Sequence, residues 1–203
     1  MQLYLVPQVR ELAARKYGSP EPYGVAFAEL DARQLGFFAD EPSRLQELSD
    51  EGFEHLIADR LDRRGLEVQL CGRTHERDGG VDIIAYPRST VVPFLIAVQV
   101  KHHRSDRKTG APDVRDFAGA LASADSPFSM GLIVTNTTFT ADARWFADHH
   151  RRLLRLRDIQ DLCRWLKDDF VNEYEWREIP ESIELTPGVV IQIPRPKLWV
   201  PKQ

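Results

Sequence analysis

Hydrophobic positions in the middle of the chain recur first with the spacing of a helical face and then in short continuous runs. The apolar residues of 50–64 share one helical stripe, and Gly65 follows where the stripe ends. We therefore predict a helix over about 50–64. The residues of this stripe are Phe53, Leu56, Ile57 and Leu61.

Five later segments have the patterns of β-strands. Residues 66–70 alternate apolar and polar side chains, as a half-buried strand does. Continuous apolar runs rich in Val and Ile indicate strands that are covered on both faces. Residues 87–90 have the composition of a turn between two of these runs. The continuous runs and the short final strand are 81–86, 94–101, 130–135 and 153–156.

Three further helices are predicted between and after these strands. Pro112 suits the first turn of one helix, and Thr140 is a natural N-cap for the next. The third helix has Ile159, Leu162, Cys163 and Leu166 on one face. The order of helix, three strands and then alternating helices and strands predicts an α/β fold, with a mixed β-sheet flanked by helices.

Both ends of the chain lie outside this pattern. We predict an N-terminal helical extension of unknown role over 1–48, a main domain over 49–170 and a C-terminal extension over 171–203. Residues 183–185 and 189–193 flank Thr186-Pro187-Gly188 and predict a β-hairpin, which a Pro-rich tail follows.

The charge of the chain is weakly acidic overall but unevenly distributed. A formal charge of −4 argues against a protein that coats nucleic acid, because such binding needs clustered Lys and Arg. Two local basic clusters are nevertheless present, over 101–108 and 144–157. Either cluster is a DNA contact or ordinary solvated surface. The candidate DNA-binding residues are Arg104, Arg107, Lys108, Arg151 and Arg152.

The sequence predicts a cytoplasmic protein. It has no apolar stretch long enough to span a bilayer, and residues 1–7 lack the features of a signal peptide. The two cysteines, Cys71 and Cys163, lie in apolar periodic segments, so we expect buried free thiols. Cys71 and His75 lack two further ligands at the spacing of a zinc site, so we do not predict a structural zinc ion.

The candidate chemistry lies between residues 78 and 101. Asp78-Gly79-Gly80-Val81-Asp82 begins one apolar run, and Gln99-Val100-Lys101 ends the next. Residues two apart on a strand share a face, so Gln99 and Lys101 point together. Each signal alone is explained by a turn or by a strand end that has reached water. Together they place a carboxylate, an amide and an ammonium at one spot.

The combined motifs closely resemble the catalytic domain of Mrr-like type IV restriction endonucleases, within the PD-(D/E)xK nuclease superfamily. Gln99 stands where many superfamily members carry a second acid. The resemblance covers about residues 50–168 and implies a restriction-endonuclease-like core. The motifs that carry it are Phe53-Glu54, Asp78-Gly79-Gly80-Val81-Asp82, Gln99-Val100-Lys101, Ile133-Val134-Thr135-Asn136 and Phe139-Thr140-Ala141-Asp142-Ala143.

The resemblance implies a magnesium or manganese site. Mg²⁺ prefers oxygen ligands and is commonly anchored by one or two carboxylates and substrate phosphate. Asp82 is the expected ligand, Glu54 a supporting carboxylate, and the Val100 backbone oxygen a third donor by similarity to the superfamily. Gln99 offers a neutral amide oxygen. Lys101 either positions the attacking water or stabilises charge in the transition state.

Two neighbouring features stay open at the level of sequence. Asp78 is either a second ligand or a turn-capping residue, and the second role is favoured. His102 and His103 either contact phosphate or face solvent as the strand ends, and again the second is favoured.

The sequence therefore predicts a Mg²⁺-dependent endonuclease that cleaves double-stranded DNA in restriction or defence. Such nucleases often act as homodimers or as subunits of larger defence complexes. Two alternatives remain: a catalytically silent nuclease fold that binds DNA or a protein partner, and a nuclease that acts on junctions or RNA.

Overall fold

The computed structural model describes residues 32–71, 79–88, 90–92, 94–150, 152–167 and 180–193. The chain divides into two compact units, residues 1–167 and 168–203, and each is described by itself. Residues 1–31 of the predicted N-terminal extension, the predicted Pro-rich tail, and Asp78, His75 and Arg151 lie outside the described residues.

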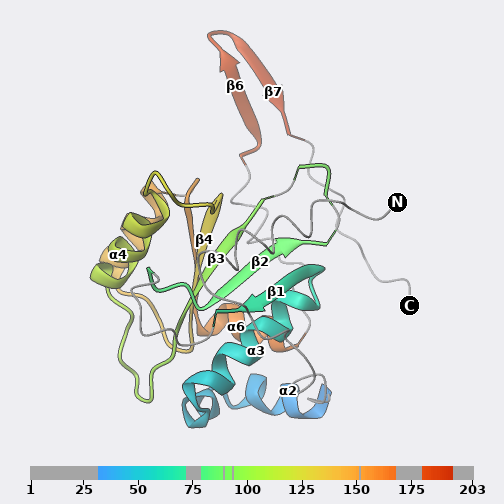
Figure 1. Ribbon diagram of the computed structural model, residues 1–203, viewed down its shortest axis with the longest axis vertical. Helices are drawn as coiled ribbons and strands as arrows, with labels where there is room; N and C mark the ends of the chain where they lie inside the picture. The colour runs from blue at the N-terminus through green and yellow to red at the C-terminus, as the bar shows by residue number, and fades with distance from the viewer. Residues whose placement is uncertain are drawn as a thin grey trace. The chain divides into compact units, whose positions relative to one another are not determined.

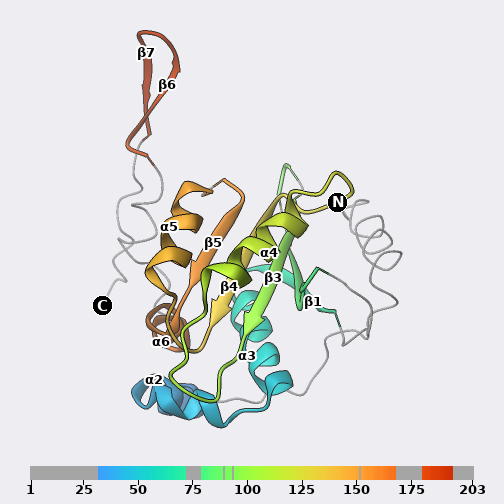
Figure 2. The same ribbon diagram turned by 90° about the vertical axis from the view of Figure 1, so that its left-hand side faces the viewer.

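The first unit is a mixed sheet with helices on both faces (Figures 1 and 2). Its strands occur in the order β1-β2-β3-β4-β5, antiparallel from β1 to β3 and parallel from β3 to β5. The predicted α/β fold is confirmed. The strands are β1 (Leu66–Leu70), β2 (Ile83–Pro87), β3 (Ile96–Lys101), β4 (Met130–Thr135) and β5 (Leu154–Arg157).

The helices form where the sequence predicts them, and the bounds of two further elements were not predicted. Ser49 caps α3 by accepting from Gly52 N, and Thr140 caps α5 by accepting from Ala143 N. These are α2 and the 3-10 helix η1, although both elements fall within the N-terminal extension that was predicted to be helical. The elements are α2 (Ala32–Asp40), η1 (Pro42–Glu47), α3 (Asp50–Asp62), α4 (Ala111–Leu121), α5 (Ala141–His149) and α6 (Ile159–Leu166).

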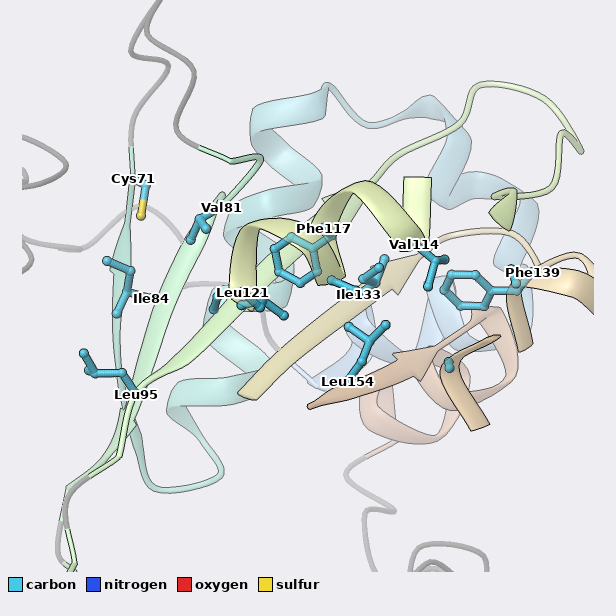
Figure 3. Packing of buried hydrophobic residues seen from close by; sticks show 14 of the residues in the cluster. Cys71, Val81, Ile84, Leu95, Val114, Phe117, Leu121, Ile133, Phe139 and Leu154 are labelled. Carbon is cyan, nitrogen blue, oxygen red and sulfur yellow. The ribbon is translucent and has the colours of Figure 1, made fainter. Parts of the chain in front are cut away.

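The main apolar core lies between the sheet and helices α4 and α5, which cross the same face. Phe117 and Val114 of α4 pack there against Ile133 of β4 and Leu154 of β5 (Figure 3). Helices α3, α6 and α2 lie on the opposite face (Figure 2). That face encloses the ion pair between Asp59 and the fully buried Arg60, whose guanidinium also donates to the Trp165 carbonyl of α6.

Burial of both sheet faces explains the continuous apolar runs. Every residue of β2 except the last is buried, and Ala97 and Val98 of β3 are fully covered. The predicted helical stripe of α3 is buried at all of its predicted positions. Among the described residues, no helix combines the length and apolar character that a bilayer span requires.

The second unit contains the predicted hairpin. Strands β6 (Ser182–Thr186) and β7 (Val189–Gln192) pair antiparallel around Gly188, which has a φ of 82°. The boundaries drawn at residues 48 and 170 stay predictions.

Candidate active site

The start of β2 and the end of β3 meet at one end of the sheet. Ile83 pairs with Val98 in an antiparallel register, and the Asp82 amide donates to the Val98 carbonyl at 2.9 Å. The Val100 amide in turn donates to Asp82 Oδ2 at 2.6 Å. Because Val100 lies between Gln99 and Lys101, this bond holds the Asp82 carboxylate against the centre of the Gln-Val-Lys motif.

The Val100 backbone faces the same side. In an extended strand, the N–H and C=O of one residue point toward the same neighbouring strand. The Val100 carbonyl therefore faces the β2 side of β3, where Asp82 lies. This geometry is compatible with the predicted role of that oxygen as a donor to a metal.

The turn before β2 requires glycine twice. Gly79 and Gly80 have φ values of 72° and 75°, a conformation that disfavours any side chain. A Cβ on Gly80 would lie 2.2 Å from Gln99 Nε2, and one on Gly79 would lie 3.0 Å from the Ala120 side chain. The turn therefore packs directly on the Gln99 amide and on α4, and it sets the position at which Asp82 enters the sheet.

Gln99 is an unusual buried amide. Its side chain is only 7% exposed, and its Oε1 atom accepts no hydrogen bond within the described part of the chain. A buried acceptor without a donor costs about 1–3 kcal/mol, so proteins rarely keep one without a use. A metal ion, a water molecule or a substrate donor would satisfy this oxygen.

Lys101 forms an ion pair that the sequence did not predict. Its Nζ atom lies 3.2 Å from Asp113 Oδ1 in the first turn of α4, and both side chains are partly exposed. An acid in the first turn of a helix has an ordinary explanation in the helix dipole, so no sequence signal singled out Asp113. The crossover of α4 over β3 is what brings it to Lys101.

Glu54 lies on the other side of the sheet from α4. It is half-buried on α3, next to the fully buried Phe53. Its assignment as a supporting carboxylate stays a prediction, as do the assignments of Asp82, Gln99, Val100 and Lys101. Among the described residues, no three His, Cys, Asp or Glu side chains form a group that could hold a metal by themselves.

His102 does not face solvent, so that part of the sequence interpretation was wrong. Its ring is 3% exposed, its Nδ1 contacts Asp50 Oδ1 and its Nε2 contacts the Leu45 carbonyl, each at 2.9 Å. It also packs on the Phe53 ring, with 5.1 Å between centroids. His102 thereby fastens the end of β3 to η1 and to the start of α3, the helix that carries Glu54.

The chain after His102 is held by side chains of the β4–α5 connection. Asn136 accepts from the His103 amide at 2.8 Å and donates to its carbonyl at 2.7 Å. His103 Nε2 contacts Thr109 Oγ1, and Thr137 Oγ1 donates to the Arg107 carbonyl. Burial, with a smaller effect of Arg107, lowers the pKa of His103. The loop between β3 and α4 is therefore anchored at several points.

This loop presents the predicted basic residues to solvent. Arg104, Arg107 and Lys108 are exposed, and none forms an ion pair with a described residue. Arg152 is likewise exposed and unpaired in that part of the chain. In contrast, Arg144 of the second cluster pairs with Asp158.

In this α/β domain, a strand pair thus brings an acid to a Gln-x-Lys motif at one end of a mixed sheet. Residues 45–166 match the family model of the restriction endonuclease family Mrr_cat. The match spans more than half of the chain, so the chain belongs to this family.

Solved structures show the same fold. One is the MspJI restriction endonuclease in complex with a 27-mer oligonucleotide, at 15% identity, a TM-score of 0.51, and coverage of 74% of this chain and 36% of that one. Another is the DNA modification-dependent restriction endonuclease AspBHI, at 21% identity, a TM-score of 0.51, and coverage of 84% and 46%. The chain thus spans less than half the length of either protein. The comparison with curated proteins gave no match.

Proposed function

We propose that this chain is a Mg²⁺- or Mn²⁺-dependent endonuclease that hydrolyses phosphodiester bonds of double-stranded DNA in restriction or defence. The observation that carries the proposal is the bond from the Val100 amide to Asp82, which sets a carboxylate between Gln99 and Lys101. The unpaired, buried Gln99 oxygen beside it supports a site that is completed by a ligand.

The residues fit a hard cation that is shared with the substrate. Mg²⁺ keeps several waters and needs only one or two protein carboxylates, so the lack of a group of three acidic, His or Cys side chains among the described residues suits it. Asp82, Glu54 and the Val100 carbonyl would hold the ion, with Gln99 Oε1 as a neutral donor. When bound, the ion supplies Lewis acidity and makes a water molecule more acidic.

The protein's own groups supply orientation and charge. The Asp82 carboxylate accepts a hydrogen bond from the Val100 amide, which holds it beside the Gln-Val-Lys motif. Lys101 places an ammonium on the same stretch of β3, where it orients the attacking water or stabilises the negative charge that develops on the phosphate.

The decisive test is plasmid cleavage with Mg²⁺ or Mn²⁺. We expect Asp82→Ala and Lys101→Ala each to lower the rate by about 100-fold or more, and EDTA to abolish cutting. Lys167→Ala is the matched control, because it removes another ion-paired ammonium, bound to Asp40. Cleavage that survives both site variants refutes the site assignment. A wild-type protein that binds DNA without cutting it favours a silent binding module.

DNA contact by the loop between β3 and α4 has a separate test in salt dependence. Replacement of Arg104, Arg107 and Lys108 by Ala should weaken binding to all DNA sequences. The slope of log binding constant against log salt concentration should become shallower by roughly 0.9 per lost phosphate contact. The same change at Arg44 and Lys167, which are ion-paired, should leave the slope unaltered. An unchanged slope in the loop variant removes the loop from the interface. Arg151 and Arg152 are tested in the same way as a pair.

The substrate and assembly are further parts of the proposal. Junction DNA and RNA serve as competitor substrates, and methylated against unmethylated plasmid tests a requirement for modified bases. One site cuts one strand, so we expect a homodimer or another subunit to supply the second cut.

A further inference from the structure

The ammonium of Lys101 is held by a carboxylate outside the predicted site. Among the described residues, Asp113 is the acid within ion-pairing distance of Lys101, at 3.2 Å. The exposed fractions are 27% for the lysine side chain and 36% for the aspartate side chain, so the pair is open to water but partly sheltered. The carboxylate also lies near His103, where it partly opposes the lowering of the His103 pKa by burial and by Arg107.

Both partners of this ion pair come from rigidly placed elements. Lys101 shares a strand face with Gln99 and with Ala97, which is fully buried in the same core cluster as Val114 and Phe117 of α4. The buried Val114 and Phe117 fix the rotation of α4 about its axis. Asp113 directly precedes Val114. The carboxylate is therefore directed at Lys101 by packing.

The start of α4 is fixed as well. Thr109 is completely buried, its amide donates to the Thr138 carbonyl, and its carbonyl accepts from the Thr140 amide. These bonds tie the chain before α4 to the chain before α5. Asp113 consequently has little freedom to move away from the end of β3.

We propose that Asp113 is a positioning residue that orients the Lys101 ammonium for phosphodiester cleavage. The inference rests on the proposed function. A lysine head on a flexible four-carbon stem loses its orientation without a partner, and misplacement of a catalytic group by about 1 Å can cost 10²-fold in rate. Because Gln99 is neutral, Asp113 supplies a negative charge that the Gln-x-Lys motif itself does not contain.

A purely structural role makes a different prediction. Asp113 lies in the first turn of α4, where any acid is stabilised by the helix dipole. In that case Asp113→Asn would lower the melting temperature slightly and leave the cleavage rate of the folded protein unchanged. The ion pair instead predicts a loss of rate without a loss of DNA affinity.

The experiment compares full-length Asp113→Asn with Asp116→Asn. Asp116 is an exposed acid of the same helix, so its removal changes the net charge equally. Single-turnover cleavage of a short duplex with Mg²⁺ gives the rate constant, and fluorescence anisotropy in EDTA gives the affinity for the same duplex. We expect Asp113→Asn to slow cleavage by about 10- to 100-fold with affinity unchanged, and Asp116→Asn to change neither.

Asp113→Glu keeps the charge and serves as the rescue variant. We expect it to restore most of the rate, because a partly exposed carboxylate tolerates one more methylene group. Equal rates for wild type and Asp113→Asn, or loss of rate in Asp113→Glu as severe as in Asp113→Asn, would overturn the inference alone. A wild-type protein that leaves the duplex intact would overturn the proposed function and this inference with it.

Discussion

The two ends of the β2–β3 pair are made by the same strands but carry opposite kinds of side chain. Where β2 begins and β3 ends, the Gln99 amide is buried under the turn at Gly80, and the Asp82 carboxylate is held by the Val100 amide. At the other end, the connecting loop exposes large apolar residues, including Val91 at 99% exposure. The site end therefore keeps a buried polar arrangement that is costly for folding, whereas the loop end leaves its apolar side chains exposed to water. This difference argues that the site end is shaped by function.

The largest effect on stability and cleavage taken together should come from Gly80→Ala. A side chain at a φ of 75° costs roughly 1–2 kcal/mol, and the new Cβ would also displace the Gln99 amide. Gly65→Ala is the control, because Gly65 has a similar φ of 82° but an added Cβ would meet nothing within 4 Å. Urea unfolding should show a larger loss of unfolding free energy for Gly80→Ala than for Gly65→Ala. Only Gly80→Ala should also lose cleavage activity. Equal losses would mean that the contact with Gln99 carries no cost.

Two buried amides sharpen the comparison further. Asn136 has both of its polar side-chain atoms bonded to His103, so Asn136→Leu should cost several kcal/mol by leaving two backbone groups unpaired. Gln99→Leu removes an oxygen that has no donor among the described residues, so it should cost less than about 1 kcal/mol while abolishing cleavage. Denaturant titration of both variants measures the difference. A large destabilisation by Gln99→Leu would show that this amide is structural.

The smallest effect on stability and cleavage should come from variants in the loop that connects β2 to β3. Val91→Ser and Val92→Ser replace exposed side chains, so each should change the free energy of unfolding by no more than about 0.5 kcal/mol. Plasmid cleavage should be unchanged in the same preparations. A marked loss of activity in either variant would show that function extends along the whole strand pair.

The core elements were predictable because local patterns and tertiary packing agree for them. Thr140 caps α5 as expected, and the run 130–135 forms β4. Some strand ends moved by one or two residues: β2 begins at Ile83, after the predicted Val81 and Asp82, although the Asp82 amide still bonds to Val98 of β3. The bounds of α2 within the predicted helical extension were not predicted, because this short helix packs mainly against α6, which lies far away in the sequence.

The site was predictable only in part, for a related reason. The relation of Asp82 to Gln99 and Lys101 follows from an antiparallel pair of adjacent strands, which the sequence indicates. The Lys101–Asp113 pair depends on where α4 crosses the sheet, and the burial of His102 depends on coverage by η1 and α3. Neither arrangement produces a periodic pattern of apolar residues in the sequence.

The antiparallel register of β1, β2 and β3 has a consequence for the order in which the molecule is built. These strands are consecutive in the chain, whereas β4 and β5 join the sheet only after crossovers through α4 and α5. Contacts that are close in sequence close smaller loops and form sooner. During synthesis, the strand pair that sets Asp82 beside the Val100 amide therefore leaves the ribosome before α4, the helix that carries Asp113.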